Sequence, residues 1–320
     1  MNKINTFIVS NVIIVAVVGA TALAIILPGP GQSLDAFHLT SPLIIIVFFC
    51  QGTGVIKLRM ENLKQYSKAL FIGFIISQTL SPILAFAYVK LFNWEADSLV
   101  GLILICTMAP TLVSGTIISE QAGGDKTASL LLTIIINILA VFTVPLNLSW
   151  TLGTEVQLEV TPLLTKLVSL VLIPALIGYW FRSKKDSFVL KNKNYFKYIP
   201  VICLGTVIYL SMSRHIDSLE KLTGEMIIQY TIASLVIHLI LLYLAYYSAL
   251  AMKIEKNTAK SVAICCSQKT IPITIAIWTS FFTQFALALL PAIVFHMTQI
   301  YCDGLIAKKW SGAKNESITD

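Results

Sequence analysis

The stretch that decides the fold is SVAICCSQKTIPITIAIWTSFF, residues 261–282, an apolar segment of membrane-spanning length with a lysine near its centre. Lys269 stands in the run Ser267-Gln268-Lys269-Thr270, two residues before a proline. A cation inside an apolar span is a functional-site hypothesis by default, because an unpaired charge is costly in hydrocarbon.

A second apolar stretch is interrupted in a comparable way. Residues 98–119 read SLVGLILICTMAPTLVSGTIIS, with Pro110, Thr111, Ser114 and Gly115 at the interruption. Broken helices at corresponding places in two halves of a membrane chain are typical of a transport site.

The composition places the chain among integral membrane proteins. Hydrophobic residues make up 56% and charged residues 12% of 320 residues, and the mean hydropathy is +0.81, far from the values of soluble domains. We therefore predict an all-α integral membrane protein with ten transmembrane helices, since about 20 apolar residues cross a bilayer. The ten stretches are 6–27, 39–56, 67–92, 98–120, 127–149, 160–182, 196–213, 224–252, 260–281 and 284–307. A closed β-barrel is excluded because its segments alternate apolar and polar residues, whereas residues 130–144 are almost continuously apolar.

Positive charges predict the orientation, because cytoplasmic loops retain Lys and Arg. The loops after spans two, four, six and eight hold most of them: Lys57, Arg59, Lys64, Lys68, Lys126, Arg182, Lys184, Lys185, Lys191, Lys193, Lys197, Lys253, Lys256 and Lys260. Both termini are thus expected in the cytoplasm, with the protein in the plasma or inner membrane of a cell. The net charge of +7 then reflects topology and lipid contact, and no nucleic-acid partner is expected. The oligomeric state stays open, and a monomer is compatible with the sequence.

The prolines suggest a duplicated chain. They pair between the halves as Pro42 with Pro200, Pro110 with Pro272 and Pro145 with Pro291. Five helices per half make the halves run in opposite directions, which gives inverted repeats. Chance placement is the alternative, because membrane helices tolerate proline.

Hydroxyl and amide side chains gather beside the first interruption. Breaking a helix in the membrane frees backbone groups that cost several kcal/mol each unless they are satisfied. Thr111 and Ser114 lie at this break, and Ser129, Thr133 and Asn137 follow at intervals of four, on one helical face. Such oxygens suit an alkali cation, although the same face is also typical of ordinary close helix packing.

Other ionisable residues are less informative. His238 and His296 could relay protons, but a lone histidine in a bundle is more often a hydrogen-bonded packing residue. Asp303 and Lys308 are expected at the cytoplasmic interface. An enzyme is not expected, because the sequence holds no His-Glu-x-x-His or comparable catalytic grouping, and the six cysteines offer no zinc spacing.

Three motifs resemble the bile acid:sodium symporter superfamily and its SBF-like sub-branch. They are PTLVSG at 110–115, AGGDKTAS at 122–129 with NILAVFTVP at 137–145, and CCSQKT at 265–270. The last is similar to the Cys-x-x-x-Lys-Ser/Thr signature of the sub-branch. The resemblance covers nearly the whole chain and implies that spans four and nine cross at unwound centres.

The resemblance also implies two domains within one transporter unit, residues 1–320. Spans one, two, six and seven, about 6–56 and 160–213, would form a panel domain. Spans three to five and eight to ten, about 67–149 and 224–307, would form a core domain.

Carried over residue by residue, the family's first sodium site would use Ser114, Ser129 and Thr133, and its second would retain Gln268. Three departures stand out. Gly115 replaces an asparagine, Ile264 replaces a glutamate shared by both sodium sites, and Lys269 replaces an asparagine.

These departures suggest a mechanism. Losing a buried carboxylate and gaining an ammonium disfavours Na⁺ at the second site through like-charge repulsion. Lys269 could then act as a built-in cation that attracts an anion, or exchange a proton as the site faces each side of the membrane. The alternative for Lys269 is snorkelling to an interface, which ten or so residues on either side oppose.

We therefore predict a secondary transporter for a small or amphipathic organic anion, working by alternating access, with Lys269 replacing a coupling sodium. The expected binding residues are Thr111, Ser114, Gly115, Ser129, Thr133, Asn137, Ser267, Gln268, Lys269 and Thr270. No organic cofactor is expected, and Na⁺ or H⁺ would be the coupling ion. A conventional sodium symporter using Ser114, Ser129 and Thr133 is the first alternative. A membrane sensor or regulator that does not transport is the second, although a passive scaffold gains nothing from strained, broken helices.

Overall fold

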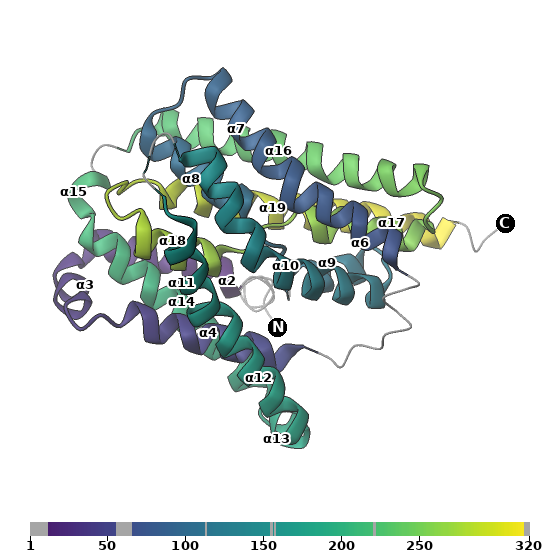
Figure 1. Cartoon of the computed structure of the whole chain (residues 1–320), viewed down its shortest axis with the longest axis horizontal. Coiled ribbons are helices and arrows are strands. Elements are labelled where there is room, and N and C mark those ends of the chain that lie inside the picture. The colour runs from purple at the N-terminus through teal and green to yellow at the C-terminus, as the bar shows by residue number, and fades with distance from the viewer. Residues whose placement is uncertain are drawn as a thin grey trace. The chain divides into compact units, whose positions relative to one another are not determined.

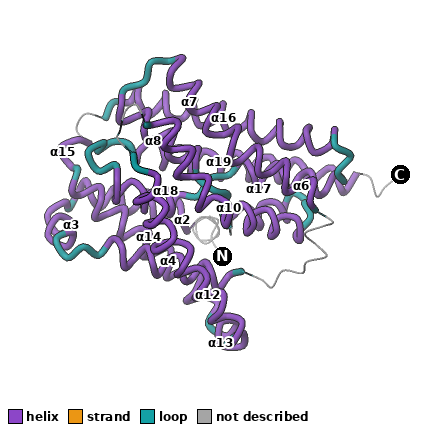
Figure 2. Tube along the Cα trace, in the orientation of Figure 1, coloured by secondary structure: helices purple, strands orange, loops and turns teal. Residues whose placement is uncertain are grey.

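The computed structural model describes residues 12–55, 66–112, 114–153, 156, 158–219 and 222–316, and its regular structure is helical throughout those residues (Figures 1 and 2). The prediction of an all-α protein is thereby confirmed for the described part. Residues 6–11 of the first predicted span, residue 56 of the second and the loop cations Lys57, Arg59 and Lys64 lie outside the described residues.

Seven helices of the described part are long and apolar enough to cross a membrane, if a helix is followed through its π-helical turn or short interruption. They are Ser67–Leu91, Lys126–Leu152, Val160–Lys184, Lys193–Arg214, Gly224–Ala251, Lys256–Phe281 and Leu289–Ser311. An eighth candidate joins α2 (Val12–Ile26) to α3 (Pro28–Asp35), which are bent by 101°. Two shorter apolar helices are α4 (Thr40–Gly54) and α8 (Ala96–Thr107). This is a multi-pass membrane protein, and the count of ten spans stays a prediction.

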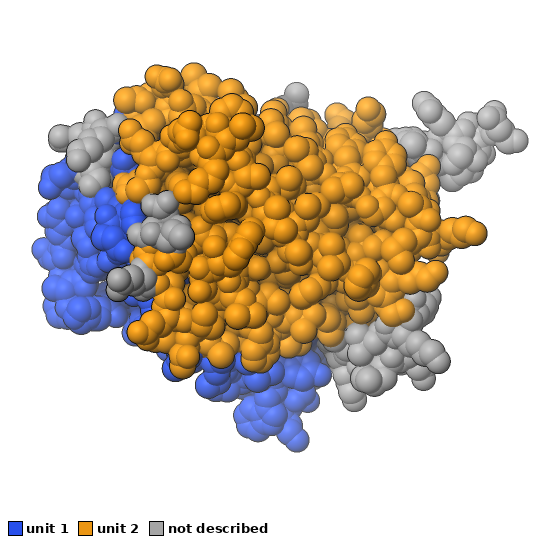
Figure 3. Space-filling view, turned by 45° about the horizontal axis from the view of Figure 1, so that its top comes forward, with its two compact units in different colours: residues 1–55, 165–222, 275–287 blue, residues 56–164, 223–274, 288–320 orange. Residues whose placement is uncertain are grey.

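One compact unit comprises residues 1–55, 165–222 and 275–287, drawn blue in Figure 3. Besides α2, α3 and α4 it holds a π-helical turn η2 (Val168–Leu172), α12 (Ile173–Lys184), α13 (Asp186–Lys191), α14 (Lys193–Arg214) and α15 (Ile216–Leu219). Glycines bring α4 and α12 together: a Cβ atom on Gly52 would lie 2.0 Å from the carbonyl oxygen of Ala175, and one on Gly178 would lie 2.0 Å from that of Phe49. These two helices can cross this closely only without side chains at the two glycines.

The other unit comprises residues 56–164, 223–274 and 288–320, drawn orange in Figure 3. Its helices are α6 (Ser67–Phe74), the π-helical turn η1 (Ile75–Leu80), α7 (Ser81–Leu91), α8, α9 (Ser114–Gln121), α10 (Lys126–Leu152), most of α11 (Val160–Leu167), α16 (Gly224–Ala251), α17 (Lys256–Ser267), the start of α18 (Ile271–Phe281) and α19 (Leu289–Glu316). The span formed by α17 and α18 is the most enclosed of the seven candidate spans. Within an 18-residue apolar stretch of this span 94% is buried, whereas the buried share is 56% or less in the other six spans. A span enclosed by protein on all sides can hold polar groups that lipid would not tolerate.

Two predicted boundaries need correction. The predicted span 284–307 becomes α19, which begins at Leu289 and continues to Glu316. Its late start places Pro291 in the first turn of the helix, where the missing N–H costs no hydrogen bond within the helix. The first span ends at Ile26, where Pro28 opens a new helix in a different direction.

Candidate functional site

Two spans are interrupted where prolines and small polar residues predict it, and both interruptions lie in the second unit. Helix α8 ends at Thr107 and α9 begins at Ser114, while α17 ends at Ser267 and α18 begins at Ile271. The two interruptions are in direct contact, because the backbone N–H of Thr270 donates to the carbonyl of Ala109 at 3.0 Å. One hydrogen bond thus joins the extended residues of one break to those of the other.

The carbonyls freed at the first break find donors from other helices. Asn137 of α10 donates its amide N–H to the carbonyl of Pro110 at 2.8 Å and to that of Thr133 at 2.7 Å. The Met108 carbonyl accepts from the Lys269 ammonium at 3.1 Å and, at a longer 3.4 Å, from the Gln78 amide. Each of the carbonyls at 108, 109 and 110 therefore has a partner, as buried backbone groups require.

A single side chain holds the backbone of Lys269 at the second break. Gln299 of α19 accepts from the Lys269 N–H at 2.8 Å and donates to the Lys269 carbonyl, also at 2.8 Å. Both backbone groups of the unwound residue are thus satisfied by one amide, much as a neighbouring β-strand would satisfy them. His296, one turn earlier on α19, places Nδ1 3.1 Å from the same carbonyl.

The Lys269 side chain is fully buried and ends on oxygen atoms. Its ammonium lies 2.6 Å from the carbonyl of Ser77, 3.2 Å from the Ser77 hydroxyl and 3.1 Å from the carbonyl of Met108. The Ser77 carbonyl is free because η1 pairs each residue with the fifth along, as in Ser81 N–H to Ile76, and the fifth residue after Ser77 is Pro82, which has no N–H. Within the described residues no carboxylate forms an ion pair with Lys269. The ammonium is therefore held by neutral oxygens alone.

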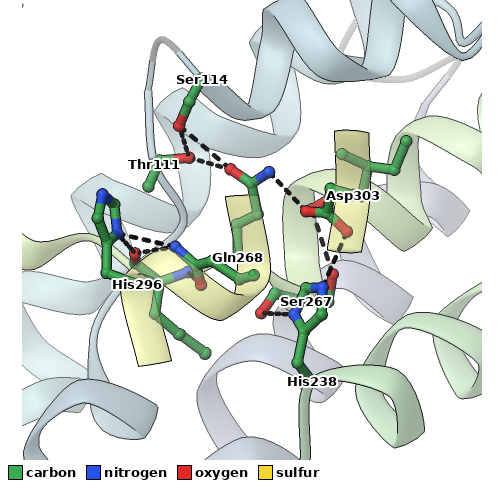
Figure 4. Close-up of polar contacts among 10 residues, drawn as sticks. Thr111, Ser114, His238, Ser267, Gln268, His296 and Asp303 are labelled. Atoms are coloured by element: carbon green, nitrogen blue, oxygen red, sulfur yellow. Dashed lines mark hydrogen bonds and ion pairs between the residues drawn. The ribbon is translucent and has the colours of Figure 1, made fainter. Parts of the chain in front are cut away.

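A second polar group crosses the break beside Lys269 (Figure 4). Gln268 donates from Nε2 to Asp303 Oδ2 at 2.6 Å, and its Oε1 accepts a short hydrogen bond from the Thr111 hydroxyl. The Ser114 hydroxyl lies 2.9 Å from Thr111 Oγ1 and 3.3 Å from Gln268 Oε1. Gly115 closes the group, since its N–H donates to Thr111 Oγ1 at 3.1 Å. Gln268 thereby connects a carboxylate of α19 to the hydroxyls at the start of α9.

Asp303 is paired with a histidine on its other side. His238 Nε2 of α16 lies 2.8 Å from Asp303 Oδ1, and His238 Nδ1 lies 3.4 Å from the carbonyl of Ser267. Both side chains are fully buried. A buried carboxylate needs hydrogen-bond partners, and here Gln268 and His238 each place a nitrogen within hydrogen-bonding distance of one of its oxygens.

The predicted residues of span five fall into two groups. Asn137 reaches the first break, as described above. Ser129 instead donates to Ser119 Oγ at 2.7 Å and lies 2.9 Å from the carbonyl of Asp125, while Thr133 donates to the carbonyl of Ser129 at 2.9 Å. In the described part of the chain no hydrogen bond joins Ser114 to Ser129 or Thr133, and no group of three or more His, Cys, Asp or Glu side chains could hold a metal ion. These oxygens are thus occupied with protein partners in the structure.

The sequence interpretation missed most of the α19 contribution. The expectation that Asp303 lies at the cytoplasmic interface is wrong, because its side chain is fully buried at the second break. The missed signal was spacing: His296, Gln299 and Asp303 stand at i, i+3 and i+7 and so share one helical face. A face with three polar residues inside an apolar span predicts a buried polar site.

Two interruptions in direct contact, with buried charged and amide side chains, in a multi-pass helical membrane protein, define the class of secondary transport proteins. The chain belongs to the SBF-like CPA transporter family, whose model matches residues 11–312. The suspected membership of the bile acid:sodium symporter superfamily is thereby confirmed, and the family consists of transporters, not enzymes.

Several of its relatives bear transporter names. The chain is 26% identical over 327 residues to the probable sodium/metabolite cotransporter BASS4 of Arabidopsis thaliana, a chloroplast protein, covering 95% of this chain and 73% of the relative. It is 21% identical to the sodium/bile acid cotransporter 7 of Danio rerio, covering 96% of each protein. It is 20% identical to the putative symporter YfeH of Escherichia coli, covering 90% of this chain and 89% of the relative.

Proposed function

We propose that this chain is a secondary active transporter that moves a small or amphipathic organic anion across a cell membrane by alternating access, with Lys269 in the place of a coupling sodium. The observation that carries the proposal is the oxygen set around the Lys269 ammonium. Two backbone carbonyls and one hydroxyl, at 2.6 to 3.2 Å, are the hard oxygen ligands that an alkali cation takes. A covalently attached cation occupying such a set repels Na⁺ and attracts an anion.

The anion is part of the same proposal. Lys269 contributes a positive charge that no carboxylate among the described residues pairs directly, and α18 begins only two residues later, so that its N-terminal N–H groups add to the positive potential. Binding at Thr111, Ser114, Gly115, Ser267, Gln268 and Thr270 would then place the substrate at the two interruptions. Proton exchange at Lys269 is the form of coupling that needs no second ion.

Two architectural proposals accompany the function. The amide of Asn137 on α10 holds the first break and that of Gln299 on α19 holds the second, which supports ten spans arranged as two inverted five-helix repeats. The panel domain would comprise about 6–56 and 160–213 and the core domain about 67–149 and 224–307; the two compact units divide the chain similarly, except that residues 275–287 belong to the first unit. Both termini in the cytoplasm, a plasma or inner membrane location and a monomeric state complete the proposal.

Sodium-coupled symport is the second candidate, and one observation favours it. The carboxylate of Asp303 lies beside Gln268, so the second break holds a negative charge despite Ile264, and the named relatives include sodium/metabolite and sodium/bile acid cotransporters. In this candidate Ser114, Ser129, Thr133 and Gln268 would supply oxygen ligands. The hydrogen bonds that now occupy those oxygens would have to be exchanged for the ion.

Uptake in proteoliposomes tests the proposal. Purified protein is reconstituted, and entry of radiolabelled taurocholate and of lactate is followed under an imposed proton gradient, an imposed sodium gradient, or neither. We expect uptake that does not require Na⁺. Uptake that depends on the sodium gradient and fails in Ser129→Ala would instead establish the second candidate. No uptake of either anion, from a protein that remains folded, would contradict transport of such anions.

A further inference from the structure

A short hairpin joins α12 to α14 in the first compact unit. Both helices belong to candidate membrane spans, Val160–Lys184 and Lys193–Arg214, and only residues 185–192 separate the two. Helix α13 occupies most of this connection, and Figure 1 shows α13 at the end of α12. A connection this short between two spans lies at the membrane surface, where the hydrocarbon core ends.

Basic side chains dominate this hairpin. Residues 182–197 include six basic side chains and one acidic one. The acid, Asp186, is neutralised from within the hairpin, because its Oδ1 lies 3.1 Å from Arg182 Nε. The other five basic side chains are exposed, and among the described residues none of them forms a salt bridge: Lys184, Lys185, Lys191, Lys193 and Lys197. The hairpin therefore has a positive surface that attracts anions.

Aromatic packing fixes the backbone that carries these lysines. Phe181 of α12, Phe188 of α13 and Phe196 of α14 have ring centroids 6.2 to 6.5 Å apart, a favourable distance for aromatic pairs. Arg182 Nη1 donates to the carbonyl of Thr53, at the end of α4, at 2.8 Å. The lysines thus project from a packed hairpin, so that less backbone ordering accompanies binding of a ligand.

Large apolar and aromatic side chains are exposed among the lysines. Four of them are more than half exposed: Trp180, Phe188, Leu190 and Tyr195. A soluble anion would satisfy the lysines but would leave these side chains in water. A membrane surface accommodates both kinds, because aromatic rings lie at the headgroup level and apolar side chains enter the acyl boundary.

We infer that this hairpin, residues 180–197, binds the headgroups of anionic phospholipids through Lys184, Lys185, Lys191, Lys193 and Lys197. The ammonium groups pair with lipid phosphates, while the exposed apolar side chains contact the acyl boundary. In the orientation proposed above the hairpin faces the cytoplasm, where the leaflet carries anionic lipid. None of these residues belongs to the two interruptions, so the inference does not depend on the proposed function.

Two variants with the same change in charge separate this site from a general effect of positive charge. The hairpin variant combines Lys184→Gln, Lys185→Gln, Lys191→Gln and Lys193→Gln. The control variant combines four substitutions at exposed lysines of the second unit: Lys253→Gln, Lys256→Gln, Lys308→Gln and Lys309→Gln. Each variant loses four positive charges at exposed positions.

The experiment measures binding of phosphatidylglycerol that carries a dansyl group on one acyl chain. Energy transfer from tryptophan reports binding to the full chain in neutral detergent micelles. Unlabelled phosphatidylglycerol, phosphatidylcholine and inorganic phosphate serve as competitors. A lysine near an anionic lipid surface increases binding about fivefold.

We expect the hairpin variant to bind the labelled lipid at least tenfold more weakly than wild type, and the control variant to stay within about threefold. Phosphatidylcholine and inorganic phosphate should compete at least tenfold less effectively than phosphatidylglycerol. If the hairpin variant does not fold, the double variants Lys184→Gln with Lys185→Gln and Lys191→Gln with Lys193→Gln replace it. Each double variant should lose about threefold or more in affinity.

Three outcomes would overturn the inference. The first is equal binding of phosphatidylglycerol by wild type and the hairpin variants. The second is an equal loss of binding in the control variant, which would show a general effect of net charge. The third is competition by inorganic phosphate as effective as that by phosphatidylglycerol, which would assign the lysines to a soluble anion.

Discussion

The strongest test of the proposed function is to remove the charge of Lys269 and ask whether sodium takes its place. Lys269→Met keeps the length of the side chain and deletes the ammonium. The oxygens that it leaves behind are the carbonyl and hydroxyl of Ser77 and the carbonyl of Met108. If Lys269 stands where a cation would bind, the variant should acquire a response to Na⁺ that the wild-type protein lacks.

The structure gives the sizes of the competing effects. Without the ammonium the Ser77 carbonyl loses its donor, which lowers the free energy of unfolding by about 1–3 kcal/mol. The Met108 carbonyl keeps its longer contact with the Gln78 amide. Removing a buried ammonium that faces only neutral oxygens relieves a desolvation penalty of several kcal/mol. The two changes oppose each other, so the variant should remain folded. Na⁺ at a hundredfold excess over its dissociation constant would then add about 2.7 kcal/mol to the free energy of unfolding.

The assay is the thermal unfolding of wild type, Lys269→Met and Lys269→Arg in detergent, each in Na⁺, K⁺ and choline at equal ionic strength. Only Lys269→Met should be stabilised selectively by Na⁺, because arginine keeps a positive charge that cannot be released. In proteoliposomes Lys269→Met should lose uptake, and Lys269→Arg should also fail if a proton is exchanged. A Lys269→Met protein that ignores Na⁺, or that transports like wild type, would refute the reasoning.

Three further predictions follow from the same region. Wild-type melting temperature should differ little between Na⁺ and K⁺; a large sodium-specific shift that disappears in Ser129→Ala would support the symporter candidate instead. Asp303→Asn should lower the free energy of unfolding by about 1.5–3 kcal/mol, since a charged acceptor is lost while its buried donors remain; chemical or thermal unfolding measures this, and an unchanged midpoint would contradict it. Gly101→Ala should reduce the yield of folded protein or lower its melting temperature by several degrees, because the new Cβ would lie 2.0 Å from the carbonyl oxygen of Ala288. A protein that folds and melts like wild type would show that α8 and Ala288, the residue before α19, can separate at little cost.

The sequence was sufficient for the fold class, the family and the places where two helices stop. Apolar length predicts spans directly, and a proline beside small hydroxyl residues predicts an interruption, as at Pro110 and Thr111. Both signals depend only on the local sequence, so they can be recognised without knowing which helices pack against each other. The binding roles of Lys269, Gln268 and the hydroxyl residues stay predictions.

The partners of these residues could not be predicted, because they depend on which helix faces the break. The sequence places Lys269 at an interruption but does not identify the oxygens around its ammonium, which belong to Ser77 and Met108. Ser77 is available only because a π-helical turn brings its carbonyl into register with a proline. Asp303 was judged by its distance from the end of the span, yet α19 continues to Glu316 and so carries Asp303 inward.

The amide of Gln299 has a consequence for the transport cycle. Because it satisfies both backbone groups of the unwound Lys269, this residue needs neither an ion nor a substrate to complete its backbone hydrogen bonding. An unloaded carrier is then not penalised at this point and can reorient empty. Symport requires that empty return step, whereas obligatory exchange requires that it be blocked. If the chain works by the proposed alternating access, a side chain that substitutes for a neighbouring strand would therefore favour net flux over exchange.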